Sequence, residues 1–323
     1  MRILIAGAGA TGGYFGARLA QAGRDVTFLV RSGRAEQLSG GLRLIGTDTD
    51  ETVQVRALTT EQLDDRPYDL VMLAVKASAL ESVLGQLGPA IGPETLVLPI
   101  LNGMRHLRLL NDRFGTDRVL GGSVRVVARV TPDGAIRQVL PLAEIVLGAQ
   151  PGGPAARADD VGRELSVPGY KLRVTQQILT TMWHKWAFIV ASGVGSILMR
   201  ASFGEIAAMP EGRDFIREVL AETEGVLNAA GYPASDSSHR SSLEMLTQPG
   251  SPFVPSLYRD FTEGREHEGE HLVGDFAATA RELGVETPLT DLALLQLRVH
   301  DRAKAADRAS GSTATEALPP DSA

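Results

Sequence analysis

A glycine-rich stretch near the N-terminus, residues 3–16 (ILIAGAGATGGYFG), has the residue types and spacing of a phosphate-binding loop. Gly7, Gly9 and Gly12 form G-x-G-x-x-G between an apolar run and an amphipathic one. The first glycine permits a tight turn, the second lets the backbone approach a pyrophosphate, and the third lets helix and strand pack closely. The alternative is a strand–helix turn of small residues without a ligand. We predict a dinucleotide-binding loop made of Gly7, Ala8, Gly9, Ala10, Thr11 and Gly12.

The residues after the second apolar run, DVTFLV at 25–30, indicate which dinucleotide to expect. NAD sites usually place Asp or Glu there, where it accepts hydrogen bonds from the ribose 2′-OH. Here Arg31 follows the run, and Arg34 comes one helical turn later. A guanidinium can bind a 2′-phosphate through charge-assisted hydrogen bonds. The sequence therefore favours NADP(H), bound by Arg31 with help from Arg34; the alternative is an ordinary exposed arginine.

Polar residues also follow two later apolar runs. YDLVMLAV leads to Lys76, and ETLVLPIL leads to Asn102. Ligands bind at the carboxyl ends of parallel strands in sheets of this kind, so both side chains are candidates for contacting cofactor or substrate. Asn102-Gly103 is also a common turn dipeptide, and either residue has a structural interpretation.

Lys185 lies within an apolar stretch, TTMWHKWAFIV. On a helix its neighbours include Met182, Phe188 and Ile189. Burial disfavours the ammonium form, which suits a general acid that must release its proton. The competing interpretation is a lysine that lays its stem on apolar neighbours and keeps its amine in water.

Residues 267–271 (HEGEH) match H-E-x-x-H, a zinc-binding pattern when it lies on a helix. If residues 266–283 form a regular helix, Glu268 lies at the border of the apolar stripe, whereas His267 faces solvent and His271 lies off the stripe. A zinc site would need both imidazoles in a protected position with a third ligand. We therefore expect no metal, take Glu268 as the functional residue, and expect both histidines to be bystanders on an exposed face.

The elements that must position these residues divide the 323-residue chain in two. Strands and helices alternate through the first part, which predicts an α/β fold with an N-terminal Rossmann-type doubly wound parallel sheet. Pro132-Asp133-Gly134 predicts a hairpin turn within it. Helical patterns alone follow, which predicts an all-α C-terminal domain. The expected boundaries are 1–174, 175–304 and a disordered tail at 305–323.

Composition excludes several classes of function. The net charge of −7 argues against a nucleic-acid binder, and the lack of cysteine excludes thiol catalysis and cysteine-based metal sites. No run approaches the ~18 apolar residues of a membrane span, and no signal peptide is visible. A cytoplasmic protein without membrane contact is the expectation.

Together these landmarks resemble the ketopantoate reductases (2-dehydropantoate 2-reductases). The shared segments are GAGATGGYFG, Val75-Lys76, the NGM at 102–104, MWHKW around Lys185, and SLYRDFTEGREHE at 256–268. The resemblance covers nearly the whole chain except the tail. It implies NADPH-dependent reduction of 2-dehydropantoate (ketopantoate) to pantoate, a step of pantothenate biosynthesis, with a helical domain that closes over the cofactor.

The resemblance also implies roles for residues. Lys185 matches the proton donor, and Glu268 matches a glutamate that holds the substrate hydroxyl and contacts the lysine and cofactor. Ser256 matches a substrate-binding serine, and Asn102 and Lys76 match cofactor- and substrate-side groups. Ile189 and Gly193 replace two asparagines of the family pattern, so the 2-oxo acid stays open. Other expectations are reduction of a different carbonyl substrate, a non-catalytic NADPH-binding sensor, and a homodimer formed through the helical domain.

Overall fold

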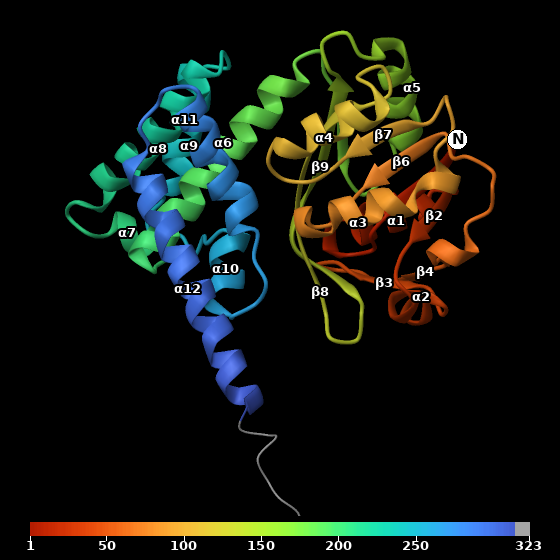
Figure 1. Cartoon of the computed structure of the whole chain (residues 1–323), viewed down its shortest axis with the longest axis horizontal. Helices are drawn as coiled ribbons and strands as arrows, with labels where there is room; N and C mark the ends of the chain where they lie inside the picture. The colour runs from red at the N-terminus through yellow and green to blue at the C-terminus, as the bar shows by residue number, and fades with distance from the viewer. Residues whose placement is uncertain (314–323) are drawn as a thin grey trace, which may run out of the picture. The chain divides into compact units, whose positions relative to one another are not determined.

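The chain folds into two compact units, and the boundary between them falls inside one long helix. The computed structural model describes the backbone of residues 1–313 and the side chains of residues 1–306 (Figure 1). The first unit is Met1–Lys185, and the second begins at Trp186. The division falls inside α6 (Ile178–Met199), whereas the sequence placed it at 174/175, just before this helix.

A five-stranded parallel sheet forms the centre of the first unit (Figure 1). Its order is β5-β2-β1-β6-β7, and every neighbouring pair is parallel. The chain moves outward from β1 to β2 and β5, then returns to β6 on the other side of β1, which creates a topological switch point beside β1. The Rossmann-type prediction is confirmed. The strands are β1 (Arg2–Ala6), β2 (Asp25–Leu29), β5 (Arg56–Leu58), β6 (Leu70–Leu73) and β7 (Leu96–Pro99), and the helices are α1 (Ala10–Gln21), α2 (Ser32–Leu38), α3 (Leu80–Gln86) and α4 (Arg105–Phe114).

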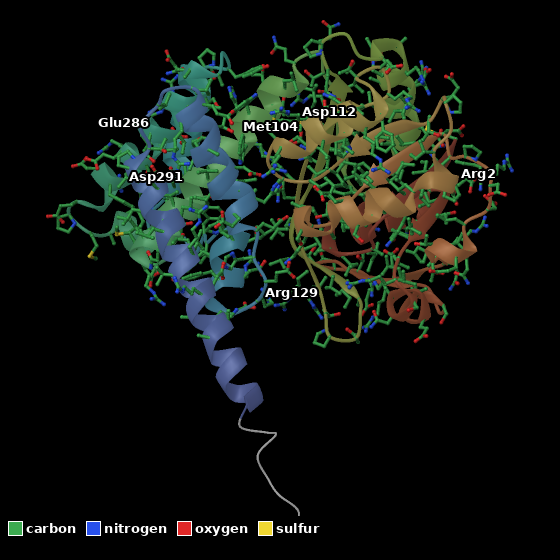
Figure 2. All side chains as sticks on the ribbon, viewed as in Figure 1. Arg2, Met104, Asp112, Arg129, Glu286 and Asp291 are labelled. Carbon is green, nitrogen blue, oxygen red and sulfur yellow. The ribbon has the colours of Figure 1, made fainter. Side chains whose placement is uncertain are left out.

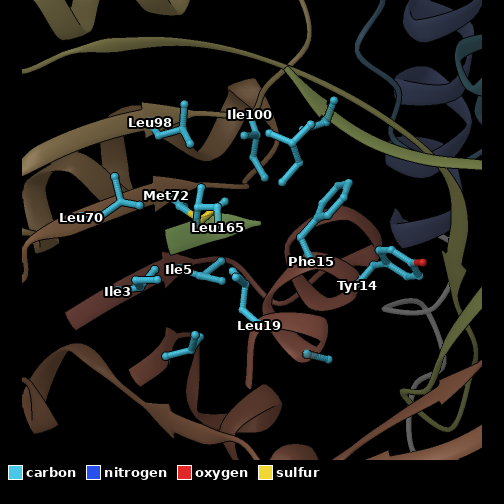
Figure 3. Close-up of a cluster of buried hydrophobic side chains, with 14 of the residues drawn as sticks. Ile3, Ile5, Tyr14, Phe15, Leu19, Leu70, Met72, Leu98, Ile100 and Leu165 are labelled. Atoms are coloured by element: carbon cyan, nitrogen blue, oxygen red, sulfur yellow. The ribbon is translucent and has the colours of Figure 1, made fainter. Parts of the chain in front are cut away.

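Both faces of this sheet are buried, as strand β1 shows. Its side chains alternate: Ile3 and Ile5 join one hydrophobic cluster, whereas Leu4 and Ala6 join another. Figure 3 shows the first cluster, where Phe15 and Leu19 of α1 pack near Ile5. Two covered faces are the arrangement expected for a parallel sheet.

A second sheet follows, ordered β10-β9-β3-β4, with β8 paired antiparallel to β9. The predicted turn between β8 and β9 is confirmed, and Gly134 has φ +85°, which glycine adopts without strain. The sequence did not predict β3 and β4, which are short. The elements are β3 (Leu42–Ile45), β4 (Asp50–Val53), β8 (Leu120–Val130), β9 (Ile136–Ala149), α5 (Ala155–Leu165) and β10 (Lys171–Val174).

The second unit is all-helical in its described part, as predicted. The carboxylate of Glu222 caps the last helix by accepting hydrogen bonds from the Leu289 and Thr290 N–H groups at 2.9 and 2.8 Å. This helix continues past residue 304, so residues 305–313 are helical rather than the expected tail; residues 314–323 lie outside the described part. The elements are α7 (Phe203–Ala207), α8 (Gly212–Ala229), α9 (Asp236–Leu246), α10 (Ser256–Thr262), a π-helical turn (Glu270–Gly274), α11 (Asp275–Glu282) and α12 (Pro288–Thr313). Among the described helices, none combines the length and apolarity that crossing a bilayer requires.

Candidate active site

The glycine loop joins β1 to α1, and its packing requires two of its glycines. Gly7 has φ +102°, and a Cβ there would lie 2.9 Å from the Ala74 carbonyl oxygen. A Cβ on Gly12 would lie 2.1 Å from the Gly7 oxygen. A Cβ on Gly9, in contrast, would meet no atom within 4 Å, and Gly9 is exposed at the N-cap of α1. The loop is therefore closed on the protein side and open above the helix N-terminus, which fits a bound diphosphate.

The remaining loop residues complete this surface. Ala8 is buried, whereas Ala10 and Thr11 are half-buried in the first turn of α1. That turn contains no acidic residue that would repel a phosphate.

Arg34 is bonded to the loop instead of standing free at its mouth. Its Nε and Nη2 donate to the Ala8 carbonyl oxygen at 3.2 and 3.0 Å. Its Nη1 donates to the Gly134 oxygen at 2.8 Å and to Gln37 Oε1 at 2.9 Å. Partial burial lowers the pKa of this guanidinium, although an arginine remains charged at neutral pH. Arg34 thus ties the glycine loop to the β8–β9 turn, which differs from its expected role as a helper at a 2′-phosphate.

Arg31, unlike Arg34, has an exposed side chain. It lies just beyond β2, at the N-cap of α2, and its side chain is exposed. Its backbone oxygen accepts hydrogen bonds from the N–H groups of Arg34 and Ala35, which fixes the first turn of α2. Of the two predicted arginines, Arg31 is the one whose side chain is exposed.

Replacing Arg34 tests its role as a clamp. Arg34→Ala leaves the Ala8 and Gly134 oxygens without these donors, so we expect the free energy of unfolding to fall by about 1–3 kcal/mol. KM should rise several-fold, by the same factor for NADPH and NADH, because the clamp holds the loop that both would share. Denaturant unfolding and kinetics with each cofactor measure the two effects. A loss confined to NADPH would instead place Arg34 on the 2′-phosphate.

Lys76 and Asn102 follow the carboxyl ends of adjacent strands, β6 and β7, whose last residues Leu73 and Pro99 are paired. Lys76 is exposed at the N-cap of a 3₁₀ turn, Ala77–Ala79, and Asn102 is half-buried. Since β1 lies next to β6, the glycine loop, which begins at the carboxyl end of β1, lies at the same edge of the sheet. The fold therefore gathers three of the predicted segments at one edge.

Lys185 is half-buried on α6 and lines a cavity of about 210 Å³. One turn earlier on the same helix, Thr181 lines it too. The opposite wall is the second sheet, which contributes Ser123, Arg125, Glu144, Val146 and Arg173. Met182, which the sequence placed beside Lys185, is buried, but the amine-bearing side chain borders a polar space rather than an apolar one. A lysine in such a place can approach a bound ligand while its stem is packed.

The sequence interpretation missed these sheet residues. Ser123 and Arg125 alternate with Val124 and Val126 along β8, a pattern typical of an ordinary half-exposed strand. Their place in the site follows only from the structure, in which β8, β9 and β10 pair and their polar residues line a cavity with Thr181 and Lys185 of α6.

In the second unit, Ser256 is the exposed first residue of α10. Glu268 is half-buried, and its carbonyl oxygen accepts a hydrogen bond from the Leu272 N–H at 2.8 Å. The π-helical turn starts two residues after Glu268; such turns are frequent at functional sites. Trp186, directly after Lys185, donates its Nε1–H to the Leu272 oxygen at 3.0 Å and meets Phe276 edge-on. The turn that follows Glu268 is thereby anchored to α6.

The expected setting of the two histidines is wrong. The regular helix assumed for 266–283 is not formed: residues 265–268 are irregular, and a wider π-helical turn follows. The His267 side chain is only 4% exposed, with Nε2 3.0 Å from Asp301 Oδ1. The His271 side chain is 14% exposed, with Nδ1 3.0 Å from Asp275 Oδ2. Both are largely buried beside carboxylates, because the helical projection does not apply there. Within the described residues, no three His, Cys, Asp or Glu side chains are grouped as metal ligands.

A Rossmann-type sheet with an open glycine loop, followed by an all-helical unit, defines the class of two-domain dinucleotide-binding proteins. Two family models match the chain: "Ketopantoate reductase PanE/ApbA" over residues 3–152 and "Ketopantoate reductase PanE/ApbA C terminal" over residues 177–300. The chain belongs to the ketopantoate reductase family, a family of oxidoreductases.

Individual relatives differ in what their names say. The chain is 30% identical to the "uncharacterized oxidoreductase YkpB" of Bacillus subtilis over 94% of this chain and 100% of the relative. It is 24% identical to a 2-dehydropantoate 2-reductase of Nostoc, covering 92% and 94%. A D-mandelate dehydrogenase solved with NADH and anilino(oxo)acetate has the same fold, with TM-score 0.84, 21% identity and coverage of 94% and 99%.

Proposed function

We propose that this protein is an NADPH-dependent reductase that converts a 2-oxo acid to the 2-hydroxy acid. The observation that carries the proposal is Lys185, a half-buried lysine beside a polar cavity in the unit that also contains the glycine loop. Membership of an oxidoreductase family supports it, as do the two-domain fold and the motifs shared with ketopantoate reductases.

Residues 7–12 would hold the diphosphate, and Arg31 the 2′-phosphate that distinguishes NADPH from NADH. The absence of a carboxylate directly after β2 supports this preference. Lys76 and Asn102, at the same edge of the sheet, would contact the remainder of the cofactor or the substrate. When bound, NADPH supplies the hydride for the carbonyl carbon.

Lys185 acts on the carbonyl oxygen. Its ammonium group stabilises the negative charge that develops there and then donates the proton that completes the hydroxyl. Ser256, with Lys76 or Asn102, binds the carboxylate of the substrate. Glu268 binds a distal hydroxyl where the substrate has one, orients the lysine and contacts the cofactor. These last roles rest on the family resemblance.

The first candidate substrate is 2-dehydropantoate, which would place the protein in pantothenate biosynthesis. The named reductases among its relatives support this choice. Ile189 and Gly193, in place of asparagines in the family pattern, favour a second candidate, a different 2-oxo acid. D-mandelate dehydrogenase shows that the same fold occurs in a protein named for another substrate. We also propose a homodimer in the cytoplasm, to be checked by sedimentation.

A substrate panel tests the proposal. Purified protein should oxidise NADPH when given one or more 2-oxo acids and should reduce no simple aldehyde at a comparable rate. The measurement is the loss of NADPH absorbance with 2-dehydropantoate and with linear and branched 2-oxo acids. Tight NADPH binding without turnover of any carbonyl compound would instead indicate a sensor.

A further inference from the structure

The cavity beside Lys185 is built from the polar face of the second sheet. In the antiparallel β8–β9 pair, Ser123 lies opposite Val146 and Arg125 lies opposite Glu144. In the parallel β9–β10 pair, Arg173 lies beside Val146. These five side chains line the cavity together, as two cross-strand rows on one face of the sheet.

The opposite face of this sheet is core. Val124, Ile145 and Leu147 point there and are buried in the first hydrophobic cluster. The alternation along β8 and β9 therefore separates an apolar face from a mixed one, on which buried Val146 lies beside the charged residues. α6 passes over the mixed face with Thr181 and Lys185, which lie one turn apart. The seven described residues that line the cavity belong to the first unit.

The charges around this space are unbalanced. Arg125, Arg173 and Lys185 bring positive charge, and among the described residues of the lining Glu144 is the one carboxylate. Glu144 offsets one cation and leaves an excess of two positive charges around a volume of about 210 Å³. A space of this size, bordered by guanidinium groups, suits a small planar anion, because the arginine fork matches the two oxygens of a carboxylate.

We propose that Arg125 and Arg173 bind a second carboxylate on the substrate, so that the preferred substrates are 2-oxo dicarboxylic acids. The inference rests on the proposed function, because it takes Lys185 to be at the reacting carbonyl. Lys185 then meets the keto oxygen at one side of the cavity, and the arginines hold the distal carboxylate. One of the two excess positive charges, on Lys185, stabilises the nascent alkoxide. The other, on the arginine pair, neutralises the second carboxylate.

Pairs of substrates matched in length test this preference. We expect kcat/KM for 2-oxoglutarate to exceed that for 2-oxopentanoate by tenfold or more, since hydrogen bonds between charged groups discriminate strongly. Arg125→Gln and Arg173→Gln should each lower this ratio by about tenfold, which brings it close to one. The control is Arg129→Gln, an exposed arginine further along β8 that is not among the cavity-lining residues and should keep the wild-type ratio (Figure 2). A wild-type ratio at or below one, or an unchanged ratio in both variants, overturns the inference.

A binding measurement separates this inference from the proposed reaction. Calorimetry on the NADPH-loaded protein should show glutarate binding at least tenfold more tightly than pentanoate, and Arg125→Gln and Arg173→Gln should remove the difference. If no 2-oxo acid is turned over but this difference is found, the reductase proposal fails and the carboxylate site stands. If 2-oxo acids are reduced but glutarate binds no better than pentanoate, the reductase stands and the second-carboxylate site is wrong.

Discussion

Lys185→Ala is expected to lower kcat by about 10²- to 10⁴-fold, the usual contribution of a positioned proton donor. The side chain lines the cavity of the first unit and comes from α6, so it is not part of the glycine loop between β1 and α1. The variant should therefore bind NADPH with nearly the wild-type Kd. Steady-state kinetics gives the first quantity, and fluorescence titration of NADPH gives the second.

Two further variants make the result specific. Lys185→Arg keeps the positive charge but cannot release a proton at neutral pH, so it should stay close to the alanine variant in kcat. Lys171→Ala removes an exposed lysine of β10 that is not among the residues lining the cavity, and it should retain the wild-type rate. A Lys185→Ala protein that turns over at near the wild-type rate would show that another group donates the proton.

The glycine loop between β1 and α1 could be predicted from sequence because the spacing of its glycines can be read over a few residues. The positions of Gly7 and Gly12 are fixed by close approaches between β1, α1 and Ala74, which only glycine allows. Likewise, Pro132-Asp133-Gly134 specifies the β8–β9 turn within a few residues. In both cases the pattern can be read over a few neighbouring residues, although Ala74, which also requires the glycines, comes from a distant segment.

The cavity could not be predicted, because it depends on contacts between distant segments. Arg125 and Glu144 lie on the two strands of the predicted hairpin, but the sequence did not give the register that places them opposite each other. Arg173 comes from β10, which joins β9 in parallel after the intervening helix α5. The prediction that both histidines are exposed failed for a different reason. Residues 265–268 are irregular and a wider π-helical turn follows them, so a projection at constant helical pitch does not apply to His267. It placed His267 in solvent, whereas its side chain is buried beside Asp301.

The two arginines after β2 show that sequence can also fail to predict the partners of residues that are close together in the chain. Sequence assigned both Arg31 and Arg34 to a phosphate, because each is a cation after the second strand. The first turn of α2 points them to different partners: Arg34 bonds the glycine loop, and Arg31 is exposed at the N-cap. Helix geometry thus decides which arginine can contact a 2′-phosphate, and variants of each residue can distinguish their roles.

Arg31→Ala is expected to raise KM for NADPH by about 10- to 100-fold, as the loss of charge-assisted hydrogen bonds worth about 1.5–3 kcal/mol implies. KM for NADH, which lacks the 2′-phosphate, should change less than about twofold, so the preference for NADPH falls by nearly the full factor. High salt should weaken NADPH binding to the wild type more than to the variant, because an exposed ionic contact is screened. Arg34→Ala is the matched control, one turn away, and should affect both cofactors alike. Equal losses for NADPH and NADH in Arg31→Ala would rule out a 2′-phosphate contact at this residue.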